Sequence, residues 1–228
     1  MPIKAVATDI DATLTDEKRR LSVEAAAALH ETERHGVPVI LVSGNVLPMC
    51  HSLNIYLGLS GPVVAENGGV VFWKKGPRLH LFKDRKEADR GFEHLGKRMR
   101  LEKVLTDRWR ETEVAVEEKG IDIEEVRRLL KEGGFNLYAN STGYGIHIME
   151  PGLSKLKGLE MACSWLGITL AQVLAMGDSE TDMEFLEACG SSGVPANASP
   201  EVKRKAGFVA PRPFGEGAVD ILRHFNII

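Results

Sequence analysis

The stretch that decides the fold is Ala5-Val6-Ala7-Thr8-Asp9-Ile10-Asp11-Ala12-Thr13-Leu14-Thr15, near the start of the chain. Its first part, Ala5–Ile10, is a short apolar run of the kind that forms a buried strand. Two acidic residues stand at the end of that strand. With each charged residue type at about 6% of a typical chain, the pattern Asp-x-Asp-x-Thr-Leu arises by chance in about one chain of this length in a hundred. The pattern is therefore informative.

Further apolar runs alternate with helical segments in the first and the last part of the chain. Strands are predicted over Val37–Val42, Pro62–Ala65 and Val173–Met176. Helices are predicted between a cap at Ser22 and Gly36, from near Pro48 to Gly58, and over Lys155–Leu166 with Gly167 closing the last. Short strands that alternate with helices at this spacing indicate a parallel sheet with crossover helices.

The pattern changes near residue 80. A hairpin is predicted from Val70–Trp73 and Leu79–Phe82, followed by a charge-rich helix that ends near Arg100. The segments after it are predicted as a strand over Glu113–Val116, a helix that begins at Asp122, and strands over Phe135–Ala139 and Tyr144–Met149 joined by the turn Asn140–Gly143. We therefore predict an α/β core over residues 1–81 and 153–228, interrupted by a small α+β insert over residues 82–152.

Composition excludes several classes of protein. The 228 residues carry a net charge of -3, without the basic excess of a nucleic-acid binder, and no apolar run approaches the length of a membrane span. The N-terminal residues lack the order of a signal peptide, so we expect a cytoplasmic protein. The oligomeric state is left open, a homodimer included. Two further groups of residues are expected to have structural roles only. Buried thiols are expected at Cys50, Cys163 and Cys189, and a solvated face at Arg98, Arg100, Arg108 and Arg110.

Polar residues stand at the ends of the predicted strands. They are Asp9, Asp11 and Thr13 after the first strand, Ser43-Gly44-Asn45 after the second, and Gly177-Asp178 with Asp182 after Val173–Met176. Lys155 opens the helix that re-enters the core. Ligands of open parallel sheets bind outside the carboxyl ends of the strands, so we expect these residues to converge at one edge. Each alone has a plain structural interpretation, as a turn, a helix cap or a solvated lysine; together they predict a site.

The chemistry of these residues points to phosphoryl transfer. Neighbouring carboxylates repel each other, and oxygen ligands select Mg²⁺ or Ca²⁺ over zinc. A carboxylate beside such an ion is a competent nucleophile toward phosphorus and would form an aspartyl-phosphate. Lys155, Ser43 and the backbone N–H groups of Gly44 and Asn45 are expected to hold the phosphate oxygens.

These residues resemble the four motifs of the haloacid dehalogenase-like phosphatases. The segment around Asp9 resembles the first motif, Leu41–Asn45 the second, Lys155 the third and Met176–Asp182 the fourth. The insert lies where the C2 type of cap belongs. Ser60–Gly69 and the segment 143–148 resemble archaeal-type phosphoglycolate phosphatases. The family implies a Rossmann-like three-layer core, Asp9 as nucleophile and Asp11 as general acid and then base. It also implies Mg²⁺ held by Asp9, the Asp11 carbonyl and Asp178, with Asp182 in or near that shell.

The sequence departs from the family pattern at two positions, and it leaves more than one function open. Ala12 stands where the family nearly always has glycine, and Thr181 replaces a common asparagine before Asp182. Phosphoglycolate is the substrate that the resemblance implies, within a class of small phosphorylated metabolites. A sugar-phosphate phosphatase, a phosphotransferase or mutase, and a non-enzymatic receiver phosphorylated on Asp9 stay open as well. Gly143, Tyr144 and His147 are candidate contacts for the leaving group, although His147 is expected to be a structural cross-strand residue.

Overall fold

The computed structural model describes residues 2–76, 78–142 and 145–228, and the chain divides into two compact units. The first comprises Met1–Leu79 and Ser154–Ile228, and the second comprises His80–Leu153. The second unit begins two residues before the expected insert and ends one residue after it. Gly143 and Tyr144 lie outside the described residues. In the described part of the chain, none of the helices combines the length and the apolar composition needed to cross a bilayer.

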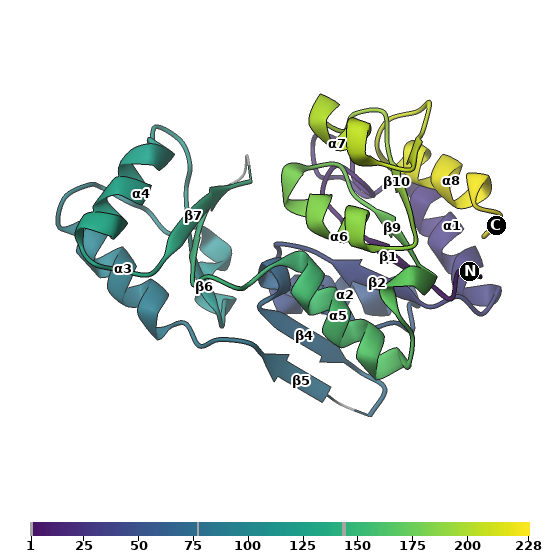
Figure 1. Cartoon of the computed structure of the whole chain (residues 1–228), viewed down its shortest axis with the longest axis horizontal. Helices are drawn as coiled ribbons and strands as arrows, with labels where there is room; N and C mark the ends of the chain where they lie inside the picture. The colour runs from purple at the N-terminus through teal and green to yellow at the C-terminus, as the bar shows by residue number, and fades with distance from the viewer. Residues whose placement is uncertain (1, 77, 143–144) are drawn as a thin grey trace. The chain divides into compact units, whose positions relative to one another are not determined.

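The first unit is built on one eight-stranded sheet in the order β11-β10-β9-β1-β2-β3-β4-β5 (Figure 1). Its strands are β1 Ala5–Thr8, β2 Val39–Val42, β3 Val63–Ala65, β4 Val70–Trp73, β5 Arg78–Leu81, β9 Val173–Met176, β10 Ser191–Val194 and β11 Phe208–Val209. The strands from β11 to β3 run parallel, and β4 pairs antiparallel with β3. The expected parallel sheet with an appended hairpin is confirmed.

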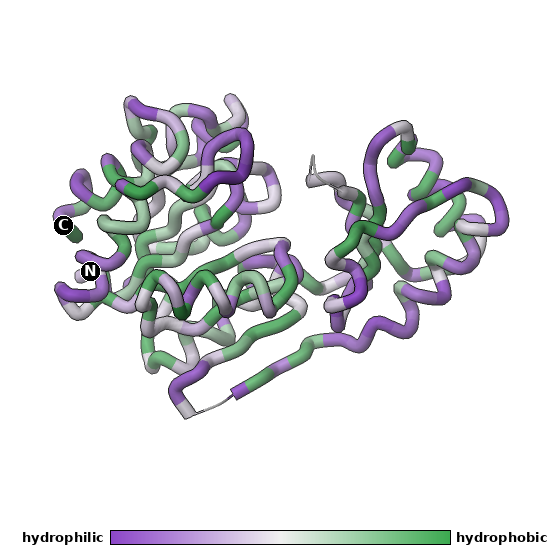
Figure 2. Tube along the Cα trace, turned by 180° about the vertical axis from the view of Figure 1, so that it is seen from behind, coloured by the Kyte–Doolittle hydropathy of each residue, from purple (hydrophilic) through white to green (hydrophobic). Residues whose placement is uncertain are grey.

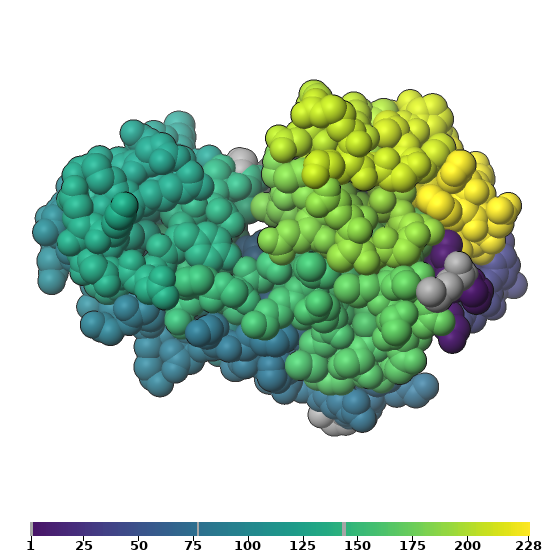
Figure 3. Space-filling view, in the orientation of Figure 1, coloured from purple at the N-terminus to yellow at the C-terminus, as the bar shows by residue number. Residues whose placement is uncertain are grey.

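Helices cover both faces of this sheet and complete the predicted three layers. They are α1 Val23–Arg34, α2 Leu47–Tyr56, α5 Lys155–Leu166, α6 Met183–Ala188, α7 Pro200–Lys205 and α8 Phe214–His224. Helices α1, α2 and α8 share one apolar core with the strands, in which Val6, Leu41 and Leu174 are fully buried. Helices α5 and α6 contact the strands as well, and they cover the face seen in Figure 3. Apolar stretches, green in Figure 2, run through the interior of this unit.

The second unit is a three-stranded antiparallel sheet, in the order β6-β8-β7, with two helices packed together on it. Its elements are α3 Lys86–Gly96, β6 Glu113–Val116, α4 Ile123–Glu132, β7 Tyr138–Ser141 and β8 Ile146–Met149, with a 3₁₀ turn at Leu105–Trp109. The predicted strand Phe135–Ala139 is displaced. Phe135 and Leu137 instead pack against the apolar core of this unit, and the expected turn residues Asn140 and Ser141 pair with β8.

A buried ionic group in the second unit corrects one expectation. Arg110, predicted on a solvated face, is only 7% exposed, and its guanidinium donates to Glu113. The same carboxylate lies 2.8 Å from Nδ1 of His147, which is also buried. His147 therefore has the structural cross-strand place expected of it. Two charged side chains removed from water are stable only as partners, so this group fixes β6 against β8.

Candidate active site

The parallel register brings the ends of β9, β1 and β2 side by side. Thr8 pairs with Leu41 on one side and with Met176 on the other. The residues directly beyond these strand ends therefore meet at one edge of the sheet, as expected of an open parallel sheet. Helix α5 adds Lys155 to this edge, because Ser154 caps the helix through the N–H of Lys157 and makes Lys155 its first residue.

Lys155 lies between two carboxylates in a buried part of this edge. Its Nζ is 2.6 Å from Oδ1 of Asp9 and 2.6 Å from Oδ1 of Asp182. Lys155 and Asp9 are each 5% exposed, and Asp182 is fully buried. Burial by itself would lower the pKa of Lys155, but the charges of Asp182 and Asp9 outweigh it and raise that pKa. The lysine is therefore cationic and fixed in place. This differs from the solvated lysine that the residue, considered without its neighbours, would suggest.

Crowding among the acids is the main electrostatic feature of the buried part. Burial raises the pKa of Asp9 well above its ordinary value; Lys155 opposes this shift, while Asp182 and Asp178 add to it. Burial, and then the charge of Asp182, raise the pKa of Asp178 to about 7, although Thr13 Oγ1 donates to its Oδ1 at 3.0 Å. One lysine therefore does not balance the acids around it.

The same carboxylates suit a hard divalent cation. Oxygen atoms of Asp9, Asp178 and Asp182 all lie within 4.8 Å of one another. A set of oxygen donors with excess negative charge matches Mg²⁺ or Ca²⁺ rather than a softer metal. A cation at this place would relieve the repulsion that raises the pKa of Asp178. The residues present thus fit the metal that the motifs imply.

Asp182 is more fully engaged than the other two acids. Its Oδ2 accepts hydrogen bonds at 3.0 Å from the N–H of Asp178, the N–H of Ser179 and the hydroxyl of Ser179. Its Oδ1 accepts from Lys155. Thr181, the departure from the usual motif, contacts the Ser179 hydroxyl at 2.9 Å. Asp182 therefore connects the loop after β9 to Lys155. Thr181 contacts this connection through the Ser179 hydroxyl, and this hydrogen bond does not involve Asp178.

Asp11 lies in a more open part of the site, with its side chain 23% exposed. Asn45 Nδ2 donates to Asp11 Oδ2 at 2.6 Å and to Ser43 Oγ at 3.1 Å. Arg19 Nε donates to Asp11 Oδ1 at 2.8 Å, and Arg19 Nη2 donates to Asn45 Oδ1 at 3.0 Å. Asp11, Asn45 and Ser43 thus form one hydrogen-bonded chain across the ends of β1 and β2.

Two backbone positions explain how closely this edge is packed. Ala12 has φ +56°, in the left-handed region that favours glycine, and its carbonyl accepts from Asn197 Nδ2 at 2.9 Å. Gly44 approaches Asn67 so closely that a Cβ atom on Gly44 would stand 2.8 Å from Asn67 Oδ1. A side chain at position 44 would therefore have to displace the Asn67 amide, whereas alanine at 12 is tolerated at a conformational cost.

The predicted site residues are thus all found at this edge, in two groups. Lys155, Asp9, Asp178 and Asp182 form the buried group, and Asp11, Asn45 and Ser43 form the open group, with Gly44 between Ser43 and Asn45 in sequence. Two contributors had no sequence signal, because Arg19 lies in the run Lys18-Arg19-Arg20, which is typical of a solvated turn, and Asn197 is an isolated polar residue. Only the tertiary contacts single these two out. Ser179 lies within the fourth motif, and its spacing of three residues from Asp182 is that of a capping box.

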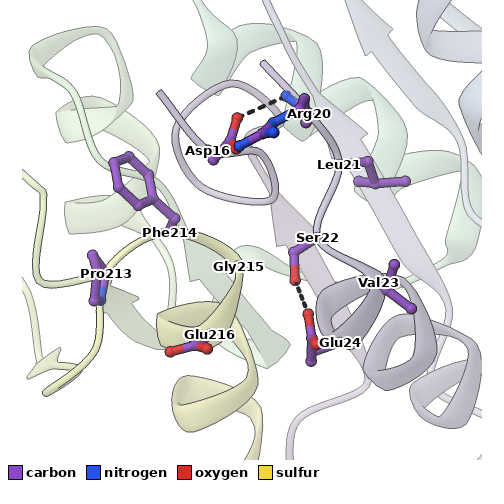
Figure 4. Close-up of a pocket in the computed structure, with 10 residues that line it drawn as sticks. All are labelled: Asp16, Arg20, Leu21, Ser22, Val23, Glu24, Pro213, Phe214, Gly215 and Glu216. Carbon is purple, nitrogen blue, oxygen red and sulfur yellow. Dashed lines mark hydrogen bonds and ion pairs between the residues drawn. The ribbon is translucent and has the colours of Figure 1, made fainter. Parts of the chain in front are cut away.

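A separate pocket of about 440 Å³ lies between the N-terminal ends of α1 and α8 (Figure 4). Its lining includes Asp16, Arg20, Ser22, Phe214 and Glu216. None of the predicted site residues lines this pocket, so we assign it no part in the chemistry.

Comparison with known proteins agrees with this geometry. A family model for haloacid dehalogenase-like hydrolases matches residues 6–98 and 80–222. A phosphoglycolate phosphatase from Methanothermobacter thermautotrophicus is 39% identical over 223 residues, covering 98% of this chain and 99% of the relative. One from Thermoplasma volcanium is 32% identical, covering 99% of this chain and 100% of the relative.

Solved structures show the same fold. A crystal structure from Thermoplasma acidophilum matches with a TM-score of 0.93 and 30% identity, covering 100% of both chains. A phosphatase of the same superfamily from Bacteroides thetaiotaomicron matches with a TM-score of 0.80 at 19% identity, which bears on the fold alone. The chain therefore belongs to the haloacid dehalogenase-like hydrolases. Within that family it is a phosphatase, as the resemblance of its motifs predicted.

Proposed function

We propose that this phosphatase depends on Mg²⁺ and hydrolyses a small phosphomonoester, phosphoglycolate, through an aspartyl-phosphate on Asp9. The observation that carries the proposed chemistry is the place of Asp9. Asp9 directly follows β1. Its carboxylate is held by Lys155 at 2.6 Å and lies among the oxygens of Asp178 and Asp182. A buried carboxylate with a fixed cation beside it is oriented for attack on phosphorus.

In the proposed first step, Asp9 attacks the phosphorus atom and the ester oxygen leaves. Asp11 donates its proton to that oxygen, so the products are the aspartyl-phosphate and an alcohol. In the second step Asp11 accepts a proton from water as the water attacks phosphorus, which releases phosphate and restores Asp9. The partial exposure of the Asp11 side chain supports this assignment, because a proton carrier must exchange with water.

The remaining predicted residues bind and neutralise the phosphoryl group in this proposal. Ser43, the N–H groups of Gly44 and Asn45, and Lys155 would hold its oxygens. Mg²⁺, when bound by Asp9, the Asp11 carbonyl and Asp178, would neutralise the charge on the transferred group. Asp182 was predicted in or near that metal shell. Because the oxygens of Asp182 already accept four hydrogen bonds, we assign Asp182 to positioning Lys155 beside the ion.

The second unit is proposed to be the C2-type cap expected from the sequence. It interrupts the first unit between the residues of the second and third motifs, and it folds around its own apolar core. Such an insert would exclude water from the reaction and read the leaving group. This role also favours a small substrate over a phosphorylated protein.

The choice of phosphoglycolate rests on the relatives. Those at 39% and 32% identity carry that substrate in their names and match this chain over nearly their whole length. The deciding experiment is an assay of phosphoglycolate beside sugar phosphates, each with and without Mg²⁺. We expect release of phosphate to require the metal and kcat/KM to be highest for phosphoglycolate. A higher kcat/KM for a sugar phosphate would overturn the substrate, and undiminished activity in a chelator would overturn the metal.

The same assay distinguishes a phosphatase from a phosphotransferase and from a receiver. Transfer of phosphate to an added sugar, in preference to water, would show a phosphotransferase. A chain that becomes phosphorylated once on Asp9 and does not turn over would show a receiver. The presence of Asp11 beside Asp9 argues against the receiver, because a stable phosphoaspartate needs no group to activate water.

A further inference from the structure

Arg19 is the basic side chain that contacts the open part of the site. Its Nε lies 2.8 Å from Asp11 Oδ1, and its Nη2 lies 3.0 Å from Asn45 Oδ1. Its side chain is 39% exposed, so part of it is open to solvent while it contacts Asp11 and Asn45. The proposed two-step chemistry gives this arginine no part.

The backbone directs Arg19 toward Asp11. Residues 15–21 form a tight loop closed by the bridge between Thr15 and Leu21 and by the hydrogen bond from Asp16 N to Arg20 O at 3.0 Å. Arg19 has φ +61° in this loop, a backbone conformation that residues other than glycine rarely adopt. Strain of this kind persists where surrounding contacts enforce it, and it gathers at functional sites. The next residue, Arg20, turns to Asp16 instead, at 2.6 Å.

The position of Arg19 relative to the leaving group follows from the role of Asp11. If Asp11 gives its proton to the ester oxygen, the guanidinium bound to Asp11 lies one side chain away from that oxygen. In phosphoglycolate the carboxylate is separated from the ester oxygen by a single CH₂ group. A carboxylate attached so closely must therefore be bound near Asp11.

A cation at that place would offset the charge of a bound carboxylate. The phosphoryl group is met by Lys155, which is already paired with two acids in the buried part. A second anionic group beside Asp11 would be repelled unless a positive charge accompanied it. Nε and Nη2 of Arg19 donate to Asp11 at 2.8 and 3.4 Å, and Nη2 also donates to Asn45. A guanidinium carries five N–H donors and a permanent positive charge, so one that bonds Asp11 and Asn45 can also bond a second carboxylate.

We propose that Arg19 binds the carboxylate of the leaving group and so selects phosphoglycolate over uncharged esters. The inference rests on the proposed function and adds a specificity residue to it. Arg19 reads the substrate, while Asp11 beside it moves the proton. An arginine at this position thus links recognition of the leaving group to its protonation.

The test compares two esters that differ in the carboxylate alone. Phosphoglycolate and ethyl phosphate have the same carbon chain length, with a methyl group in place of the carboxylate in the second. We expect Arg19→Gln to lower kcat/KM for phosphoglycolate about 10- to 100-fold more than kcat/KM for ethyl phosphate, whose smaller loss would report the missing contact with Asp11. Arg19→Lys keeps the charge without the guanidinium and should fall between wild type and Arg19→Gln.

Arg20→Gln is the matched control, because Arg20 lies in the same loop as Arg19 but pairs with Asp16 and not with Asp11 (Figure 4). It should leave both esters unchanged, and thermal unfolding of each variant checks the fold. Equal loss for the two esters in Arg19→Gln would mean that Arg19 only positions Asp11, and no loss would mean a solvated side chain; both overturn the inference while the proposed function stands. Wild-type enzyme inactive on phosphoglycolate would overturn the proposed substrate and the inference with it.

Discussion

Asp9 and Asp11 are two residues apart at the end of one strand, yet their surroundings differ in nearly every respect. Asp9 is buried and held by a lysine, among other acids. Asp11 is partly exposed and held by the guanidinium and amide groups of Arg19 and Asn45. The buried position suits a group that must be held in one orientation for attack on phosphorus. The wet position suits a group that must gain and lose protons.

The sharpest way to break this comparison is Asp9→Asn. The amide keeps the shape of the carboxylate but removes the nucleophile, so we expect phosphate release to fall by at least about 10⁴-fold for every ester. The measurement is phosphate release from phosphoglycolate and from p-nitrophenyl phosphate with Mg²⁺. Retained activity on either ester would show that another group attacks phosphorus.

Asp11→Asn should have a smaller effect that depends on the ester. Loss of the proton donor should lower turnover of phosphoglycolate by about 10²- to 10³-fold. p-Nitrophenolate leaves without a proton, so formation of the aspartyl-phosphate from that ester should be nearly normal. A burst of nitrophenol at the enzyme concentration, followed by slow turnover, is expected. If the burst is lost as completely as in Asp9→Asn, the two carboxylates do not have separate roles.

The raised pKa of Asp178 gives a prediction about pH. Because the folded protein binds this proton more tightly than the unfolded chain, the metal-free protein should lose stability as pH rises from about 4 to about 7. Mg²⁺ competes with the same proton, so its affinity should rise over that range. We expect Mg²⁺ to raise the melting temperature more at about pH 8 than at about pH 5.5.

Asp178→Asn serves as the control for that pH experiment, since it removes the titrating group while keeping its shape. The difference in the Mg²⁺ effect between the two pH values should shrink in this variant. An equal increase in melting temperature at both pH values in the wild-type protein would contradict the assignment of Asp178 to the metal.

The smallest expected effect belongs to Ala12→Gly, between the two carboxylates. Alanine at φ +56° is strained, and glycine should raise the free energy of unfolding by about 1 kcal/mol, as measured in urea. Turnover should stay equal or rise. Gly36→Ala, at φ +79° with no neighbour near its Cβ position, is a control of opposite sign and should destabilise. A tenfold fall in turnover for Ala12→Gly would show that alanine is the fitted residue here.

Sequence patterns located some elements well and others poorly. Helix α5 was predicted at its observed bounds, Lys155–Leu166, because its apolar stripe and the closing Gly167 are local signals. The structure adds a cap at Ser154 and shows Gly167 in the left-handed conformation, at φ +67°. The strand expected at Phe135–Ala139 is displaced to Tyr138–Ser141, because apolar residues report burial and not strand pairing. Phe135 lies beside His94 in the last turn of α3, and the centroids of the two rings are 5.2 Å apart. The order of the strands across the sheet was likewise beyond a reading of local patterns.

The sequence by itself determined the alternating core, the place of the insert and the identity of the acids at the strand ends, because periodicity, caps and spacing are local properties. Only the tertiary structure decided that Lys155 lies between Asp9 and Asp182, that Asp11 is paired with Arg19, and that Ala12 takes a glycine conformation. Those facts depend on distances between segments far apart in the chain or on backbone angles imposed by packing. The same two letters, Asp and Asp, therefore became a buried carboxylate and an exposed one only when the fold supplied their neighbours.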